Sequence, residues 1–367
     1  MKVYIKTFGC QMNKHDSEVV LGLLLSQGYK AVESREKADV ILVNTCSVRK
    51  HAEDKVYSML GELTKLKKSK PDLIVGVMGC MAQKDKKVIF KRSSNVNFVC
   101  GTHNFQRIPE MIKTVAKQKT KIDLTEMGKQ VFVSPTLSSR GEKNSAWVSI
   151  MKGCDNFCSY CIVPYVRGRE ISRSADDIMR EVKELAHAGY KKVTLLGQNV
   201  NSYGKGLNEN VDFSDLLKLI HRIEGIELID FATSHPKDIS LKLIDAVASL
   251  EKVSRYFHFP LQSGSDKILH LMNRGYTLSH YMEIVNKLRE KIHNIKLGTD
   301  IIVGFPGEDE TDFNQTYQVI KGIKFSQVYM FKYSPRQGTA AFKLKDNVTE
   351  QIKKDRLNKI INLQRSI

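Results

Sequence analysis

The chain has 367 residues, enough for two or three domains, and its hydrophobic content of 41% is sufficient for real cores. No apolar run reaches the roughly 18 residues of a membrane span, and residues 1–6 read directly into a strand, so no membrane segment and no signal peptide are expected. The formal net charge of +18, from 58 basic and 40 acidic residues, makes nucleic acid the natural partner, and a merely soluble basic surface is the alternative.

Residues 1–115 alternate short strands and helices, which predicts a doubly wound parallel sheet. Residues 40–44 are apolar throughout, as a buried parallel strand requires. Residues 17–26 form an amphipathic helix that ends before Gly28. The other predicted elements are strands at 3–7, 73–77 and 96–99 and a helix at 52–66.

Residues 116–144 are polar and irregular and are interpreted as a linker. From residue 145 to residue 367 the alternation resumes, and six strands with intervening helices predict an incomplete (β/α)6 barrel, whose active site lies at the carboxyl ends of the strands. The clearest helix is 176–188, preceded by Ser174 with Asp177 three residues on, a capping-box pattern. The predicted strands are 147–151, 192–196, 227–232, 255–259, 296–303 and 327–333, and the last helix is 349–364.

Cys154, Cys158 and Cys161 follow the first barrel strand with the spacing Cys-x3-Cys-x2-Cys. Three thiolates can bind three irons of a [4Fe–4S] cluster and leave the fourth iron open to chelate S-adenosylmethionine (SAM) and pass it an electron. Structural zinc is the alternative, but zinc and ferredoxin sites both use four protein ligands, and the next histidine, His187, lies in a predicted helix. The spacing therefore predicts a radical-SAM cluster.

The set of cysteines that comes first along the chain lies in the N-terminal part, where Cys10, Cys46 and Cys80 each follow a predicted strand of the sheet. The carboxyl ends of parallel strands share one edge, where ligands bind, so these thiols are expected to meet and to hold a second cluster. Three ordinary buried cysteines are the alternative. Cys100 also follows a strand, but the set is complete without it. Seven cysteines, six of them in two sets of three, argue against disulfides and for a reducing, cytoplasmic location.

Further candidates are polar residues at the ends of barrel strands, which face the barrel mouth. Arg167 and Arg274 are candidates for contacting phosphate or the SAM carboxylate, whereas His235 and His258 are interpreted as structural. The predicted SAM-binding residues are Gln198, Ser234, Gln262 and Asp300.

Several motifs of the sequence resemble those of the radical-SAM methylthiotransferases, and the match runs through nearly the whole chain. The MiaB subgroup, which acts on tRNA, typically has Gln-Met-Asn after the first cysteine and Ser-Val-Arg after the second, as this sequence has after Cys10 and Cys46. The matching segments are 7–13, 44–49, 79–83, 153–168, 196–203, 304–308 and 333–336.

The resemblance implies an enzyme that adds a methylthio group to C2 of N6-isopentenyladenosine next to the tRNA anticodon. It implies two [4Fe–4S] clusters with SAM: the radical-SAM cluster on Cys154, Cys158 and Cys161, and an auxiliary cluster that presents sulfur on the N-terminal set. It further implies a monomer that binds the anticodon stem-loop, an electron donor such as flavodoxin or ferredoxin, and a sulfur donor. Members of the subgroup continue into a C-terminal RNA-binding TRAM domain. The sequence stops at Ile367, where that domain would begin, as expected of a shortened chain, a partial sequence or a natural variant. This departure would bear on RNA affinity rather than on cluster chemistry.

Two other functions fit parts of the pattern. One is a methylthiotransferase that acts on a ribosomal protein side chain, which the net charge and the motif wording disfavour. The other is a non-catalytic, metal-stabilised RNA-binding protein, which predicts zinc, or clusters that never cleave SAM. Two sets of three cysteines, each one ligand short, fit such a structural role poorly.

Overall fold

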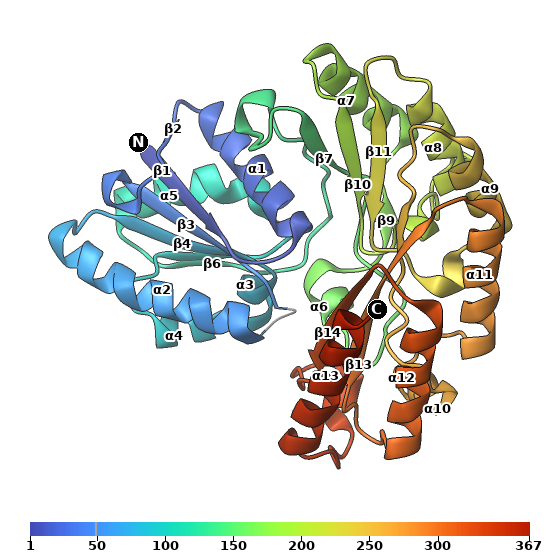
Figure 1. Ribbon diagram of the computed structural model, residues 1–367. Helices are drawn as coiled ribbons and strands as arrows, with labels where there is room; N and C mark the ends of the chain where they lie inside the picture. Colours follow the sequence, from blue (N-terminus) through green and yellow to red (C-terminus); the bar gives the residue numbers. More distant parts are fainter. Residues whose placement is uncertain (48–49) are drawn as a thin grey trace.

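The computed structural model describes residues 1–47 and 50–367. Val48 and Arg49, which end the second N-terminal motif, lie outside these ranges. The chain forms two α/β parts that lie side by side (Figure 1). Within the described ranges, no helix has both the length and the hydropathy that crossing a membrane requires.

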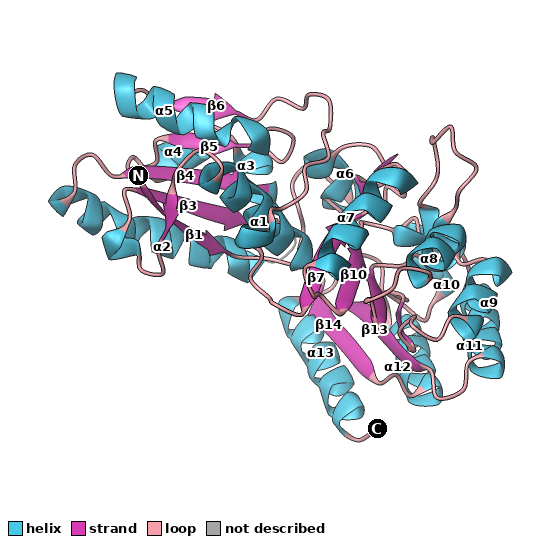
Figure 2. Cartoon of the chain, turned by 90° about the horizontal axis from the view of Figure 1, so that it is seen from above, coloured by secondary structure: helices cyan, strands magenta, loops and turns pink. Residues whose placement is uncertain are grey.

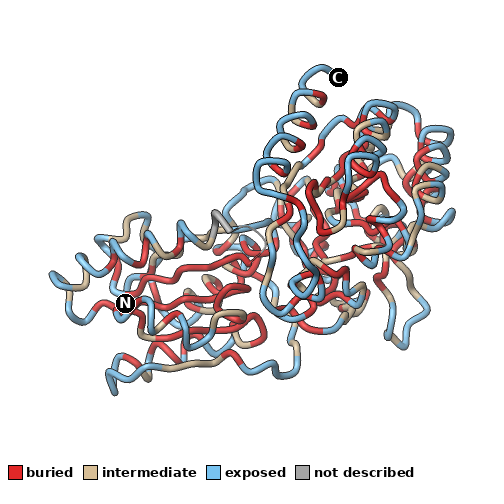
Figure 3. The backbone as a smooth tube through the Cα atoms, turned by 90° about the horizontal axis from the view of Figure 1, so that it is seen from below, coloured by how far each residue is buried: buried red, intermediate tan, exposed pale blue. Residues whose placement is uncertain are grey.

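The N-terminal part is a parallel sheet with helices on both faces, which confirms the predicted doubly wound fold. The alternating side chains of β3 (Val40–Thr45) explain the layers, since Leu42 packs with α1 and α5 on one face and Ile41 packs with α2 on the other. Figure 3 shows the strands as a buried layer. The strand order is β2 (Lys30–Ala31), β1 (Lys2–Thr7), β3, β4 (Ile74–Gly79), β5 (Phe98–Cys100) and β6 (Ile122–Leu124), and the helices are α1 (Gln11–Leu25), α2 (Lys50–Ser69), α3 (Cys80–Asp85), α4 (Val88–Arg92) and α5 (Ile108–Gln118).

The structure differs from the sequence-based expectation at the start of α1 and in several elements that were not predicted, namely β2, β6 and the helices α3, α4 and α5. Helix α1 begins at Gln11, six residues before the predicted start, because its polar first turns are buried by partners from elsewhere in the chain. Strand β6 lies inside the stretch interpreted as a linker and adds a sixth strand beside β5. Its three residues are only partly buried, so the strand shows no apolar run in the sequence.

The C-terminal part consists of two three-stranded parallel sheets that form an open arc (Figure 2). A parallel bridge between Ile229 and Val253 connects the two sheets. The predicted first strand, 147–151, is split, because Met151 already belongs to a separate antiparallel pair. The sheets are β11 (Leu228–Ala232), β10 (Lys192–Leu196) and β7 (Ser145–Ser149), and β12 (Tyr256–His258), β13 (Lys296–Val303) and β14 (Gln327–Lys332); the helices are α6 (Val163–Arg167), α7 (Ala175–His187), α8 (Phe213–His221), α9 (Leu241–Ser249), α10 (Asp266–Leu271), α11 (Leu278–Lys291), α12 (Glu310–Ile323) and α13 (Glu350–Arg365).

Ser174 caps helix α7, but only half of the predicted capping box forms. The Ser174 hydroxyl accepts a hydrogen bond from the Asp177 amide, at 3.3 Å. The Asp177 carboxylate instead pairs with Arg180, one turn further along the helix. An arginine within reach on the helix surface thus draws the acidic side chain away from the cap.

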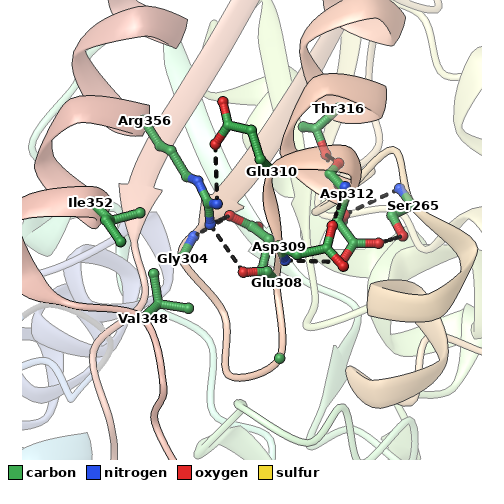
Figure 4. A network of polar contacts seen from close by, with 12 residues as sticks. Ser265, Gly304, Glu308, Asp309, Glu310, Asp312, Thr316, Val348, Ile352 and Arg356 are labelled. Carbon is green, nitrogen blue, oxygen red and sulfur yellow. Dashed lines mark hydrogen bonds and ion pairs between the residues drawn. The ribbon is translucent and has the colours of Figure 1, made fainter.

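A buried ion pair connects the end of β13 to the last helix (Figure 4). Glu308 accepts hydrogen bonds from the Gly304 amide and from Arg356 of α13, both at 2.8 Å. The two side chains of the ion pair are 1% and 6% exposed, and burial raises the pKa of Glu308 to about 7. The motif at 304–308 therefore closes its own loop and anchors α13 against the barrel.

Replacing Arg356 by Met is expected to destabilise the barrel by about 3–5 kcal/mol, because it leaves Glu308 buried without its partner. Urea unfolding followed by fluorescence of Trp147, the one tryptophan of the sequence, reports on this part of the chain. Lys359→Met is the control. Lys359 and its partner Glu310 are both more than half exposed, at 3.5 Å, so its loss should cost less than about 1 kcal/mol. Equal effects of the two variants would contradict a role for the buried pair.

Candidate active site

The three N-terminal cysteines meet at one edge of the first sheet. Cys10 precedes α1, Cys46 follows β3, and Cys80 is the first residue of α3. A Cβ atom added to Gly9 would lie 2.9 Å from the Cβ atom of Cys46. Burial raises the pKa of the Cys80 thiol to about 12, the Arg167 guanidinium opposes this shift, and the Cys46 and Cys10 thiols add to it. The structure therefore brings the predicted set together.

A reciprocal pair of buried amides holds two of these loops against each other. The Asn13 side chain donates to Asn44 Oδ1 at 3.1 Å and to the Thr45 carbonyl at 3.0 Å. The Asn44 side chain donates in return to the Asn13 carbonyl at 2.7 Å. Gly79 has φ +97°, and a Cβ atom there would lie 2.4 Å from Asn44 Oδ1. Neither asparagine was singled out from the sequence, although each stands within three residues of a cysteine.

The second set of cysteines lies in a loop enclosed by the antiparallel pair β8 (Met151–Lys152) and β9 (Ile171–Ser172). Cys154 and Cys158 are buried, and Cys161 is half-buried. The Cys154 amide donates to the Gly168 carbonyl at 3.3 Å, and the Cys161 amide donates to the Cys158 carbonyl at 2.9 Å. The loop thus folds back on itself, and its three thiols lie beyond the end of β7.

Cys158 lies beside two buried basic side chains. Arg274 Nη1 is 3.2 Å from Cys158 Sγ, and its other branch donates to the Pro260 carbonyl. His235 Nε2 is 4.0 Å from the same sulfur. Burial lowers the pKa of His235 to about 2, so the imidazole is neutral and the guanidinium carries the charge. Arg274, a candidate for contacting phosphate or the SAM carboxylate, is buried and faces a cysteine sulfur.

A cavity of about 440 Å³ lies beside both cysteine sets. Its lining includes Cys161 of the second set and Ser47, which follows Cys46 of the first. Gln262 and Asp300 also line it, and the buried Gln262 Oε1 has no hydrogen-bond partner among the described residues. An unpartnered buried amide facing a cavity suits the binding of a polar ligand.

The other two predicted SAM-binding residues do not line this cavity. Gln198 Oε1 accepts a hydrogen bond from the Gly153 amide at 2.5 Å, so it holds the start of the second cysteine loop. Ser234 is buried, and its hydroxyl has no hydrogen-bond partner in the described part of the chain. The structure therefore brings only Gln262 and Asp300 together with the cysteines at the cavity.

The donor chemistry of both sets suits iron–sulfur clusters. Each set offers three thiols, and soft thiolates are the ligands that such clusters take. Across residues 1–47 and 50–367, no three His, Cys, Asp or Glu side chains form a group that could hold a single metal ion. Gly9, Gly79 and Gly153 adopt positive φ angles beside the cysteines, where side chains would crowd the loops.

Two family models match the two parts of the chain. "Uncharacterized protein family UPF0004" matches residues 2–101, and "Radical SAM superfamily" matches residues 148–320. The second match covers the Cys-x3-Cys-x2-Cys loop and the barrel strands up to β13. A [4Fe–4S] cluster and SAM are the cofactors of that superfamily, so the second cysteine set is placed in a domain of the type that uses them.

Curated relatives match nearly the full length of this chain. A tRNA-2-methylthio-N(6)-dimethylallyladenosine synthase of Thermoanaerobacter pseudethanolicus is 49% identical over 367 residues, which cover 99% of this chain and 78% of that protein. A protein of the same name from Desulforamulus reducens is 47% identical over 369 residues, which cover 100% of this chain and 81% of that protein. Among solved structures, the radical SAM methyltransferase TsrM from Kitasatospora setae has a TM-score of 0.63 at 12% identity, covering 90% of this chain and 74% of that one. The last likeness concerns the fold alone.

Proposed function

The chain belongs to the tRNA-2-methylthio-N(6)-dimethylallyladenosine synthase family, and we propose that it adds a methylthio group to C2 of N6-isopentenyladenosine next to the anticodon of tRNA. It is thus a radical-SAM tRNA methylthiotransferase. The observation that carries this proposal is the cavity reached by Cys161 on one side and by Ser47, the neighbour of Cys46, on the other. A substrate atom in that cavity would lie between the two sets of thiols.

The residues have distinct proposed roles. Cys154, Cys158 and Cys161 would hold a cluster that supplies the electron for SAM cleavage, and hence a radical able to attack an unactivated aromatic C–H bond. The N-terminal set would hold an auxiliary cluster as the site of sulfur transfer. Gln262 and Asp300 face the cavity and would orient SAM or the adenosine. Gln198 would act indirectly, by fixing the Gly153 amide at the start of the cysteine loop.

The proposed partners follow from the chemistry. The net charge of +18 favours the phosphates of a tRNA anticodon stem-loop. A radical-SAM cluster needs a low-potential electron donor of the flavodoxin or ferredoxin kind, and each turnover removes sulfur that a donor must replace. A reducing cytoplasm would keep all six thiols available.

The test begins with anaerobic reconstitution and an iron and sulfide count, followed by SAM, dithionite and tRNA. About eight irons per chain, release of 5′-deoxyadenosine and a methylthiolated nucleoside in the digested tRNA are expected. The matched substrate control is the same tRNA without the isopentenyl group. Methylthiolation of a ribosomal protein instead of tRNA would favour the alternative acceptor. Bound zinc without SAM cleavage would overturn the proposal.

A further inference from the structure

The short helix α6 leaves the second cysteine loop and packs against the first cysteine set. Ile162 and Val166 contact Cys80 in one small apolar cluster. The Thr102 hydroxyl donates to the Val166 carbonyl at 2.5 Å, and the Gln130 side chain donates to the Arg167 carbonyl at 2.9 Å. The segment that directly follows Cys161 therefore packs against Cys80 and is hydrogen-bonded to residues near it.

Arg167, the last residue of α6, carries a buried charge to the N-terminal cysteines. Its Nη2 atom is 2.7 Å from Oδ2 of Asp16 in α1, and the two side chains are 6% and 4% exposed. The guanidinium interacts electrostatically with both Cys80 and Cys10, and it opposes the rise that burial causes in the pKa of Cys80. The C-terminal part thus provides one arginine for each cysteine set. Arg167 interacts electrostatically with the first set, and Arg274 contacts Cys158 of the second.

The other titratable groups near this pair are neutral, screened by solvent or occupied by partners of their own. Burial lowers the pKa of His15 well below its usual range, so its imidazole is neutral. The Lys152 ammonium donates to the Val131 carbonyl at 2.7 Å in an exposed contact, where solvent screens its charge. Arg173 is occupied by Glu181 in a buried ion pair of its own. Arg167 and Asp16 therefore form a buried ion pair that interacts electrostatically with the first set.

A cluster bound by three thiolates is anionic, and one-electron reduction adds a further negative charge without making or breaking a bond. A fixed positive charge in a water-poor site stabilises the reduced form, and a fixed negative charge opposes it. We propose that Arg167 and Asp16 form a buried charge pair that sets the reduction potential of the auxiliary cluster. The pair is a positioning and tuning element, and the inference rests on the proposed function because it requires that cluster.

The experiment uses the full chain with Cys154, Cys158 and Cys161 replaced by Ala. The auxiliary cluster is then the one cluster left, and its reduced form gives the measured signal. The cluster is titrated with dithionite and followed by electron paramagnetic resonance. Asp16→Asn should raise the midpoint potential and Arg167→Gln should lower it. Each shift should change the ratio of reduced to oxidised cluster at a fixed potential about tenfold, which is 59 mV for a one-electron couple. Arg167→Lys keeps the charge and should stay close to the parent.

The matched control is Arg169→Gln. Arg169 forms the same kind of ion pair with Asp155, at 2.7 Å, but its side chain is 74% exposed, so solvent screens the charge. Shifts of opposite sign at the buried pair, absent from the control, support the inference, because a merely structural role would move both variants in one direction. Shifts of equal sign, or no larger than the control, overturn it. A parent chain that binds no iron on the first set refutes the proposed auxiliary cluster itself.

Discussion

Cys10→Ala is expected to cleave SAM at close to the normal rate and yet to form no methylthiolated tRNA. Cys10 belongs to the sheet edge of the first part, whereas the proposed SAM cleavage would require only the loop that holds Cys154, Cys158 and Cys161. With two thiols left, the proposed auxiliary cluster would lack one of its three cysteine ligands. Cys46→Ala and Cys80→Ala should behave alike, while Cys158→Ala should lose both SAM cleavage and product.

Cys100→Ala is the control for these variants. Cys100 is fully buried at the end of β5, close to the same sheet, and its sulfur interacts with the Gly101 carbonyl. It should retain both iron content and product, at a stability cost of about 1 kcal/mol for the lost sulfur. The measurements are iron content, 5′-deoxyadenosine by chromatography and modified nucleoside by mass spectrometry. Full methylthiolation by Cys10→Ala would contradict the proposal that the first set holds a reacting cluster.

Gly153→Ala is expected to abolish the radical-SAM cluster while leaving the auxiliary one in place. Gly153 has φ +77°, and a Cβ atom there would lie 2.0 Å from the Arg169 carbonyl oxygen, a backbone atom that cannot rotate away. Relief requires β8 and β9 to separate, which also displaces Cys154 from its hydrogen bond to Gly168. Iron content should fall to about half, and SAM cleavage should fall by at least about 100-fold.

A second glycine separates the steric clash from the backbone strain. Gly189, which follows α7, has φ +88° but nothing within 4 Å of an added Cβ atom. Gly189→Ala should therefore cost about 1 kcal/mol of stability through the left-handed backbone alone and leave both clusters intact. Anaerobic iron counts and SAM cleavage by the two variants, compared at equal protein concentration, provide the measurement. Normal cleavage by Gly153→Ala would mean that the loop tolerates a shift of its first residue.

The sequence predicts apolar strands well, because a buried parallel strand needs little more than a run of apolar residues. The predicted strands 192–196 and 296–303 coincide with β10 and β13. The start of α1 was missed because His15 and Asp16 look like surface residues. Their burial depends on Arg167, 151 positions away from Asp16, which no local pattern can indicate.

In the candidate site, too, local features can be predicted from the sequence, whereas contacts between distant residues cannot. Cysteine spacing and strand-end placement are local features, so both sets could be proposed directly from the residues. Which strand-end polar residues reach the cavity depends on how loops pack, and Gln262 and Asp300 cannot be told apart from Gln198 by position alone. The roles of Ser47 at the cavity wall and of Glu308 inside its own loop likewise became visible only in three dimensions.

The reciprocal amides of Asn13 and Asn44 have a consequence for how the protein matures. They join the loops of Cys10 and Cys46 through protein atoms alone, with three hydrogen bonds that need no inorganic group. Folding of the chain alone therefore fixes Asn13 against Asn44 and Thr45, next to Cys10 and Cys46. Binding of the proposed auxiliary cluster would then require less ordering of the protein, which reduces its entropic cost.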